Sequence, residues 1–402
     1  FKQKTAYEIG VRLVGSEMCI RDRNVVGVGT AKSEGLRKGV VVNIEKTVKA
    51  IKKAVEECEL MCGTQIRSVY AGIAGHHIRG QNSRGMVTVY HNRIVTDEDI
   101  RRVIDAAQVL IPNDREVLHI LPQEFIVDDQ DGVQNPLGMA AARLEVNVHI
   151  VTGSVTSAQN IIKCCNQSGL DVEDIVLEPL SSSQAVLSPD EQEVGVVLVD
   201  IGGGTTDVTI YSEGSIVHTA VLALGGNHLT HDIAIGLGAP LHEAEEIKHN
   251  FGVAMTSMVK EDEMIEVPSV GGRNNRTMKK RVLASIIEDR FREIFELIAH
   301  EIEKTHFHTL MASGVVITGG TCIMPGADQL ASQVLNLPVR VGFPENISGL
   351  REMIYSPKYA TSVGLVRYGI TSNQGKLHFA GDDTNLFHKV SRRMKDWMQN
   401  FF

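Results

Sequence analysis

The chain has 402 residues, of which 43% are hydrophobic and 22% are charged, as in a globular protein with room for two or more domains. Its formal net charge of −9 argues against nucleic-acid binding, because contact with a phosphate backbone requires a basic surface. The six cysteines lack metal-site spacing, no apolar stretch is long enough to cross a bilayer, and no signal peptide is visible. We therefore expect reduced thiols in a cytoplasmic protein.

The first 23 residues differ in character from the rest of the chain. They show neither helical nor strand periodicity, and they resemble the translated sequencing-adapter read-through that is sometimes fused to protein sequences. We expect residues 1–23 to be non-native and the natural sequence to become legible at Asn24.

From Asn24 onward the pattern is that of alternating strands and helices. Residues 24–43 predict two short strands around a glycine-containing turn. Residues 44–62 predict a helix that ends at Gly63, because apolar side chains recur there every three or four positions. RSVYAGIAG (67–75) predicts a buried strand.

Between residues 81 and 160 the pattern changes to that of a small α+β unit. MVTVYHNRIV (86–95) alternates like a strand, and the helix predicted after it begins with Thr96 as N-cap and acids in its first turn. EFIVDDQ and LEVNVHIVTG predict further strands. We therefore predict an inserted subdomain over 81–160. The core on either side of it is predicted to comprise residues 24–80 and 161–190.

After residue 190 the alternation of strands and helices resumes. The predicted second core comprises residues 191–226 and 306–370. Between them, residues 227–305 are predicted to form a smaller subdomain that includes a long helix over 279–305. Residues 371–385 are polar with scattered glycines, which predicts a linker.

The segment VLVDIGGGTTDVTIY (197–211) places three glycines between two acids, directly after an apolar strand. Such a loop lets backbone N–H groups approach phosphate closely. A dinucleotide-binding fold is disfavoured because a strand pattern, not a helix, follows, and the Gly-Lys-Ser/Thr step of a P-loop is absent. The remaining interpretations are a β-hairpin whose tip holds phosphate and a glycine turn without a ligand. We favour the first, because a plain turn does not need the flanking Asp200 and Asp207.

GVVITGGTCIMPG (314–326) repeats the design of a strand followed by glycines more than a hundred residues later. Two such turns at one cleft could hold the two ends of a nucleotide. The second signal is weak alone and supports the first.

As a set, these segments resemble the actin and DnaK ATPase superfamily, and within it the FtsA family of bacterial cell-division proteins. The similarity covers residues 24–402 and is carried by LEPLSSSQAVL (177–187), DIGGGTTD (200–207), LALGGNHLTHDIA (222–234), AEEIK (244–248) and VITGGTCIMPG (316–326). EVPSVGGR (266–273) and the C-terminal tail are closer to FtsA than to chaperones, actin or MreB.

The resemblance implies an α/β fold of the actin-like (ribonuclease H-like) type, with two lobes, an inserted α+β subdomain and a C-terminal amphipathic helix. It implies ATP and Mg²⁺ as cofactors, with at most slow ATPase activity. Asp200 would bind Mg²⁺ through water, because Mg²⁺ dehydrates reluctantly. The residues expected to contact the nucleotide are Gly202, Gly203, Gly204, Thr205, Thr206, Gly225, Gly226, Glu245, Lys248, Gly319 and Gly320.

Two of these implied roles have plainer alternatives. Glu178 and Asp207, with Asp200, are expected to act in catalysis by positioning water, but an acid such as Glu178 also suits a helix N-terminus. Glu245 and Lys248 lie on one helix face and are expected to hold the ribose and adenine. A solvated surface pair would give the same spacing.

The chain departs from the family at one place. The family's first phosphate loop follows its first strand, in a pattern like DIGTSK, whereas EMCIRDR (17–23) stands there in this chain. We therefore expect this polypeptide to bind ATP poorly even if the natural protein binds it well.

The tail over residues 386–402 predicts a basic amphipathic helix. Its apolar face comprises Phe387, Val390, Met394, Trp397, Met398 and Phe401. Lys389, Arg392, Arg393 and Lys395 occupy the rest of the surface, against one acid, Asp396. A helix docked on its own core rarely needs a cationic face and a polar linker, so we favour a membrane surface with anionic lipids.

The resemblance also implies partners and a location. It predicts attachment of FtsZ filaments to the cytoplasmic face of the bacterial inner membrane at the division septum, and self-association into polymers. The FtsZ C-terminal peptide is expected on residues 227–305, with Arg290 as a candidate contact to an acidic partner, and the basic run 271–281 could join it. The inserted subdomain (SHS2-type) is expected to serve self-interaction and contact with later divisome proteins.

Two other functions remain alternatives. A small-molecule kinase on the same fold needs a substrate-deprotonating acid in the cleft and gains nothing from a cationic tail. A cytoskeletal scaffold such as MreB is disfavoured by the position of the insert and by the tail.

Overall fold

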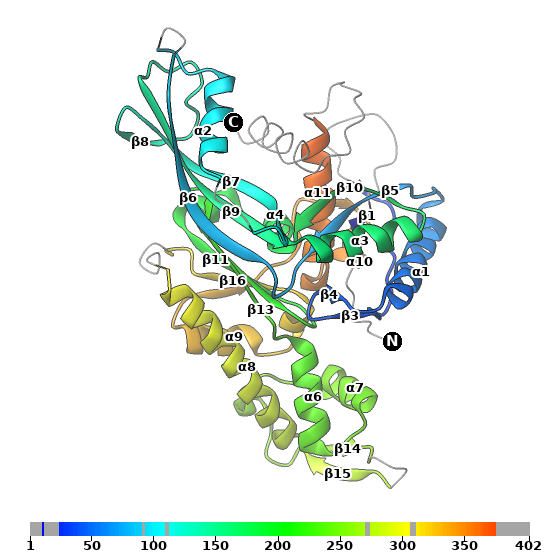
Figure 1. Ribbon diagram of the computed structural model, residues 1–402. Coiled ribbons are helices and arrows are strands. Elements are labelled where there is room, and N and C mark those ends of the chain that lie inside the picture. The colour runs from blue at the N-terminus through cyan, green and yellow to red at the C-terminus, as the bar shows by residue number, and fades with distance from the viewer. Residues whose placement is uncertain are drawn as a thin grey trace.

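The computed structural model describes residues 10–11, 24–90, 93–108, 112–269, 274–305 and 311–374. Two lobes meet at helices α4 (Glu178–Val186) and α11 (Ala360–Gln374), and an inserted sheet that includes β6 (Arg79–Thr88) and β7 (Arg115–Val127) projects from one side (Figure 1). None of the helices in these ranges is long and apolar enough to span a membrane.

The first lobe contains a three-stranded sheet in the order β1-β5-β10, in which β10 runs parallel to β5. Its strands are β1 (Gly10–Val11), β5 (Ser68–Ile73) and β10 (Asp171–Leu177). Its helices are α1 (Ile44–Cys62), α3 (Val155–Gln167), α4 (Glu178–Val186), α10 (Arg351–Ile354) and α11 (Ala360–Gln374). Two short pairs complete it: β2 (Asn24–Val25) with β18 (Ser348–Gly349), and β3 (Leu36–Arg37) with β4 (Val40–Val41).

Local sequence signals set the bounds of α1. The Asn43 side chain accepts a hydrogen bond from the Lys46 N–H group, and Gly63 ends the helix in the left-handed conformation with φ 68°. Ile51, Val55 and Cys58 lie on its buried face and pack with the cysteines of α3. The predicted helix is therefore present with the predicted end.

The inserted subdomain is a four-stranded antiparallel sheet in the order β6-β9-β7-β8, with one helix against it. Its elements are β6 (Arg79–Thr88), α2 (Asp97–Ala106), β7 (Arg115–Val127), β8 (Gln130–Val133) and β9 (Arg143–Ser154). Thr96 and Asp99 form a reciprocal capping box at the start of α2, as the sequence signal predicted for this N-terminus.

The insert is also fastened to the second lobe. Its His149 ring lies 2.9 Å from the Thr219 hydroxyl oxygen of β13, and the Asn82 amide donates to the Val217 carbonyl oxygen at 3.1 Å. A Cβ on Gly80 would lie 2.3 Å from the Thr219 hydroxyl oxygen, so the backbones can approach only because this residue is glycine.

The second lobe is built on a five-stranded sheet in the order β13-β12-β11-β16-β17. Its strands are β11 (Val196–Ile201), β12 (Thr206–Ser212), β13 (Ser215–Leu222), β16 (Val315–Thr318) and β17 (Val339–Val341), with α5 (Pro189–Val194) and α9 (Ala327–Leu335) beside them. The continuous apolar run of β11 is wholly buried and pairs in parallel with β16. The carboxyl ends of these two strands therefore lie side by side.

A small subdomain extends from this lobe at the bottom of Figure 1. It comprises α6 (Gly226–Leu237), α7 (Leu241–Phe251), β14 (Met264–Val267), β15 (Arg276–Lys279) and α8 (Lys280–Glu303). The buried face of α8, including Phe291 and Phe295, closes the core beneath the sheet.

The C-terminal end of the described chain differs from the prediction at one place. Residues 371–374, predicted as the start of a linker, form the last turn of α11. The rest of that segment and the predicted amphipathic helix over 386–402 lie outside the described residues.

Candidate functional site

The three-glycine loop forms the tip of a β-hairpin. In the β11–β12 register Asp200 lies opposite Asp207, and the Gly202 N–H group donates to the Thr205 carbonyl oxygen at 2.9 Å. The loop thus stands at the carboxyl end of β11, which is where open α/β sheets place their ligands.

Glycine segments far apart in sequence meet at this tip. The Gly226 N–H group and the Thr321 hydroxyl group both donate to the Gly202 carbonyl oxygen, at 3.0 and 2.9 Å. The Asn227 N–H group donates to the Gly203 carbonyl oxygen at 2.8 Å. The predicted cofactor segments 202–204, 225–226 and 319–320 are therefore brought together in one place.

The glycines serve different purposes. A Cβ on Gly225 would lie 2.5 Å from the Gly202 carbonyl oxygen, so close packing of two loops requires glycine there. Gly319 combines a left-handed φ of 91° with a Cβ position only 2.5 Å from Asp200 Oδ1. Gly202 has neither constraint, since its φ is not left-handed and its Cβ would meet nothing closer than 3.4 Å. Because Gly202 has no side chain, the space at the tip stays open, and a phosphate group can approach the backbone there.

Asp200 joins the two lobes at this tip. Its Oδ2 accepts hydrogen bonds from the Ser182 hydroxyl of α4 and the Thr361 hydroxyl of α11, at 2.5 and 3.0 Å. Burial raises the pKa of the Asp200 carboxyl, and these two hydrogen bonds partly oppose that rise. The first-lobe partners were not predicted, because Ser182 and Thr361 are 18 and 161 residues away in sequence.

Two further acids face Asp200. Burial, with repulsion from Asp200, raises the pKa of Glu178 to about 8. Burial, with repulsion from Glu178 and Asp200, holds the pKa of Asp207 well above its usual range. Glu178 is also the first residue of α4, as its alternative interpretation required, but the helix dipole would lower this pKa and burial wins. A cation near the three acids would relieve the repulsion.

The acids do not form a ready-made metal cage. Among the described residues, no group of three or more His, Cys, Asp or Glu side chains is placed to hold a metal ion. The Asp207 Oδ1 atom is buried without a hydrogen-bond partner. The donor set therefore fits Mg²⁺ that keeps most of its waters better than an ion held directly by protein.

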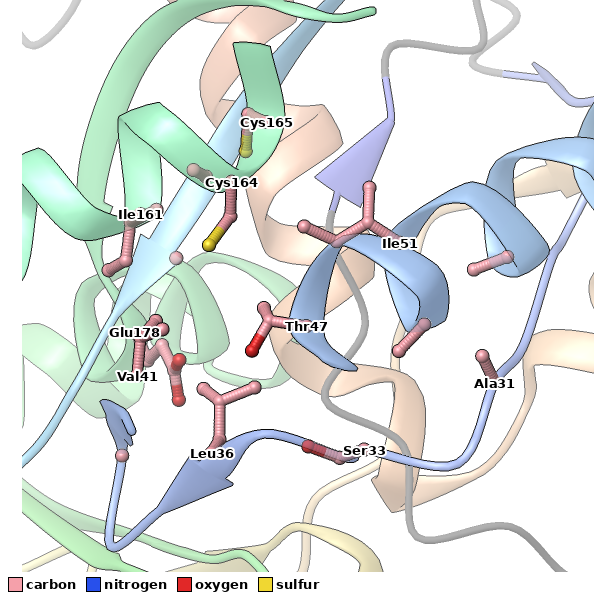
Figure 2. A pocket seen from close by; sticks show the side chains of 15 residues that line it. Ala31, Ser33, Leu36, Val41, Thr47, Ile51, Ile161, Cys164, Cys165 and Glu178 are labelled. Atoms are coloured by element: carbon pink, nitrogen blue, oxygen red, sulfur yellow. The ribbon is translucent and has the colours of Figure 1, made fainter. Parts of the chain in front are cut away.

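A cavity of about 80 Å³ lies behind Glu178, between α1, α3 and the β3–β4 pair. Figure 2 shows the Glu178 carboxyl group on one side of it, facing the Thr47 hydroxyl group of α1, with Cys164 and Ile161 of α3 above. The Thr47 hydroxyl is already committed, because it donates to the Asn43 carbonyl oxygen at 2.9 Å. The partly exposed surface of Glu178 thus faces a mainly apolar enclosure rather than bulk water, which explains its raised pKa.

This pKa predicts how stability depends on pH. The native state holds a proton on Glu178 up to about pH 8, whereas the unfolded chain loses it near 4.5, so stability falls as pH rises between these values. Glu178→Gln removes the Glu178 share of this fall, while the shares of Asp200 and Asp207 remain, and stabilises the protein at pH 8.5 by on the order of 2–4 kcal/mol relative to the parent chain. Denaturant unfolding of parent and variant at pH 5 and 8.5 measures this difference. Glu173→Gln, at an exposed position of β10, is the control and should keep the fall seen in the parent chain. An equal fall with pH in parent and variant would contradict the assignment.

The two threonines of the loop differ in their availability. The Thr206 hydroxyl donates to the Leu224 carbonyl oxygen at 2.9 Å, and its only proton is therefore used inside the protein. The Thr205 hydroxyl donates to Asp207 Oδ2 across a longer 3.4 Å. Of the two, Thr205 is the freer donor at the tip, and Thr206 fixes the turn that leads to Gly225.

Glu245 and Lys248 are not a solvated surface pair. Lys248 is 7% exposed, and its ammonium group donates to Glu245 Oε2, the Thr230 hydroxyl and the Gly226 carbonyl oxygen, at 2.7, 2.8 and 3.2 Å. Burial raises the Glu245 pKa, but hydrogen bonds from His249 and Lys248 overcome it and lower the value to about 2. The pair therefore supports the glycine turn at the start of α6.

Arg290 is engaged within the protein. Its guanidinium group donates to both carboxylate oxygens of Asp232 on α6, at 2.5 and 3.0 Å, and it also pairs with Glu293. Its side chain is 23% exposed. The predicted membrane-contact residues, in contrast, all lie outside the described residues.

Family models match two parts of the chain, and a solved structure has a similar fold. A family model described as "Cell division protein FtsA" matches residues 197–364, and one described as "SHS2 domain inserted in FTSA" matches residues 75–152. A solved PilM-PilN type IV pilus biogenesis complex contains a chain of similar fold, with a TM-score of 0.62, 16% identity and coverage of 86% of this chain and 92% of that one. The predicted two-lobed α/β fold of the actin-like type, with its inserted subdomain, is confirmed.

Curated relatives match over nearly their full length. The chain is 44% identical to cell division protein FtsA of Pseudomonas aeruginosa, covering 98% of this chain and 95% of that protein. It is 42% identical to the Neisseria meningitidis protein, with coverage of 94% and 92%, and 39% identical to that of Escherichia coli. The chain therefore belongs to the FtsA family of cell division proteins.

Proposed function

We propose that ATP with Mg²⁺ binds where the three glycine segments meet, only weakly in this chain because EMCIRDR (17–23) stands in place of the family's first phosphate loop, and that the protein tethers FtsZ filaments to the cytoplasmic face of the inner membrane at the division septum. The observation that carries the nucleotide part is the convergence of Gly226, Asn227 and Thr321 on the carbonyl oxygens of Gly202 and Gly203. Membership of the FtsA family supports the division role.

The residues divide into three roles in this proposal. Backbone N–H groups of the 202–204 loop and the Thr205 hydroxyl would hold phosphate, with Asp200 binding Mg²⁺ through water. Glu178 and Asp207 would position water, which is the modest protein share of phosphoryl transfer. Residues 319–320 and the Glu245–Lys248 pair would border the nucleoside side. When bound, the Mg²⁺-nucleotide supplies the reactive phosphoanhydride.

The nucleotide proposal is tested by the Mg²⁺ dependence of binding. Asp200→Asn keeps the size and the hydrogen bond acceptor but removes the charge, so we expect Mg²⁺-dependent binding of a fluorescent ATP analogue to weaken at least about tenfold, the effect of about 1.4 kcal/mol. Asp190→Asn, an exposed change on α5, should bind like the parent chain. Equal Mg²⁺ dependence in Asp200→Asn and the parent would reject the site.

The membrane part rests on the tail over residues 386–402. Each basic residue near an anionic leaflet contributes about 1 kcal/mol. The apolar side chains enter only the interface, and each contributes less than the roughly 1.5–3 kcal/mol of full burial. A single tail is thus a reversible anchor, whereas several tails on one polymer bind much more tightly, since later attachments are intramolecular.

The partner sites that we propose lie on different parts of the molecule. We infer that the FtsZ C-terminal peptide binds the small subdomain over 227–305, and that the insert serves self-association and later divisome proteins. Because Arg290 is paired with Asp232 and Glu293, the triple variant R290D/D232R/E293Q keeps the first ion pair, moves the positive charge to α6 and leaves no acid facing the new aspartate, with E293Q alone as control. Loss of FtsZ-peptide affinity in this triple variant supports a contact by Arg290, and unchanged affinity would remove it.

A further inference from the structure

A second groove lies away from the glycine loops, where the two lobes and the insert meet. It has a volume of about 350 Å³, comparable to small-ligand pockets. Strand β7 of the insert, helices α4, α5 and α11, and the β12–β13 turn contribute to it. Its apolar lining comprises Leu121, Pro122, Leu180, Ala185, Leu187 and Ile216. This floor could accept an aromatic side chain and its apolar neighbours.

The rim of this groove is acidic. Glu345 lines it, and Glu213 precedes the lining residue Gly214 in the β12–β13 turn. Asp190 and Glu193 lie on α5 beside the lining residues Pro189 and Gln192. All four carboxylates are exposed, and none forms an ion pair with another residue of the described chain. Among the lining residues Glu345 is the acid and Arg367 the base, and the three further carboxylates on sequence neighbours of lining residues make the surroundings of the groove negative.

The described chain ends beside this groove. Arg367 and Thr371 of α11 line it, and α11 ends at Gln374, less than one helical turn further on. Residues 375–385 could span at most about 36–40 Å before the tail begins, at 3.3–3.6 Å per residue. The groove is therefore within reach of residues 386–402, and a short link makes the effective concentration high.

The tail matches the groove in chemistry. It carries Lys389, Arg392, Arg393 and Lys395 against one acid, Asp396, beside an apolar face that includes Trp397 and Phe401. An apolar face suits the floor, and the basic residues suit the rim. Helix-in-groove recognition uses this combination of apolar anchors and complementary charge.

The groove is also connected to the glycine-loop site. The Ser183 hydroxyl of α4 lies 2.5 Å from the Tyr211 hydroxyl, and both residues line the groove. The preceding residue, Ser182, donates to Asp200. One turn of α4 thus contacts the groove on one side and the carboxylate of the site on the other.

We propose that residues 386–402 dock as a helix in this groove when no membrane is present, with the aromatic face on the floor and the basic face against the acidic rim. The same apolar face cannot lie in a bilayer at that time, so docking and membrane binding exclude each other. This consequence rests on the membrane role proposed above, whereas docking itself does not. A docked tail also contacts α4, whose Ser182 donates a hydrogen bond to Asp200.

Trp397 is the single tryptophan of the chain and reports directly on docking. In lipid-free solution we expect acrylamide to quench Trp397 several-fold less in the full chain than in a synthetic peptide of residues 386–402. The double variant E213K/E345K changes only exposed residues, and it should reduce the ratio of docked to free tail about tenfold, equivalent to about 1.4 kcal/mol. E56K/E98K makes the same charge change on α1 and α2 and should leave quenching unchanged.

A second measurement tests docking without the covalent link between α11 and the tail. The chain cut after Asn385 should bind the synthetic tail peptide, and E213K/E345K should weaken that binding by the same factor. Quenching of the full chain equal to that of the free peptide would overturn the proposal, as would protection that E213K/E345K does not reduce. Protection seen only with anionic vesicles would also overturn docking, while leaving the membrane role intact.

Discussion

Gly319→Ala is expected to destabilise the protein and to abolish Mg²⁺-dependent nucleotide binding together. The new Cβ would lie 2.5 Å from both Asp200 Oδ1 and the Ile201 carbonyl oxygen, and a φ of 91° adds strain for any other residue. Left-handed strain of about 1–2 kcal/mol and overpacking of about 1–3 kcal/mol give an expected loss of roughly 2–5 kcal/mol in unfolding free energy. The carboxylate must also move, because β11 cannot yield without breaking its pairing with β16.

Gly320→Ala provides the matched control. A Cβ on Gly320 would meet only the Lys358 side chain, at an ordinary 3.7 Å, and its φ is not left-handed. We expect it to change unfolding free energy by less than about 1 kcal/mol. Urea unfolding of both variants checks the stability difference. ATP-analogue titration compares Gly319→Ala with the parent chain, because Gly320 is itself proposed to border the nucleoside. Equal unfolding free energies of the two alanine variants would show that the crowding at Gly319 has no consequence for the fold around Asp200.

Lys248→Met is expected to lower the free energy of unfolding more than a substitution of a solvent-exposed lysine on a helix would. It would remove the ammonium group from Glu245 and leave that half-buried carboxylate with His249 and Thr230 as its remaining partners. Breaking a fully buried pair costs about 3–5 kcal/mol, and the 25% exposure of the Glu245 side chain lowers our expectation to roughly 2–3 kcal/mol. The Gly226 carbonyl oxygen also loses a donor, so the glycine turn should loosen.

The double variant E245Q/K248M separates charge from packing. It leaves no unpaired carboxylate and should recover at least half of the lost stability. The pH profile gives a second check. In the parent chain, ionised Glu245 contributes stability that is present above its unfolded pKa of 4.5 and is lost as pH falls through about 2. In Lys248→Met this acid-side loss should shrink, and a full-sized loss would contradict the role given to Lys248.

The sequence was informative where a local pattern determines a local conformation. The caps of α1 and α2, the continuous apolar run of β11 and the glycines at the hairpin tip are all short-range signals, and the structure has each of these elements in place. The repeated design of a strand followed by glycines groups residues 202–204 with 319–320, and the family resemblance adds Gly225 and Gly226. The contact between these segments depends on a hydrogen bond from Thr321 to Gly202, across 119 residues, which no local pattern contains.

Other features depend on tertiary contacts that the sequence does not display. AEEIK has the spacing of a surface ion pair, and only the packing of α7 against α6 buries Lys248. Arg290 looked available to a partner, but Asp232 lies on the neighbouring helix. The first four residues of the predicted linker, TSNQ (371–374), are polar, yet they continue α11, which ends at Gln374 just before Gly375. The bond between His149 and Thr219 likewise attaches the insert to a lobe from which it is distant in sequence.

The tether itself is tested most directly by co-sedimentation with anionic vesicles, with and without purified FtsZ. The full chain is compared with the same chain cut after Asn385, which leaves the whole described structure intact. We predict that the full chain sediments with the vesicles and carries FtsZ down, and that the truncated chain leaves both in the supernatant at low salt. Equal sedimentation of FtsZ by the two chains, or failure of the full chain to bind vesicles at low salt, would contradict the account.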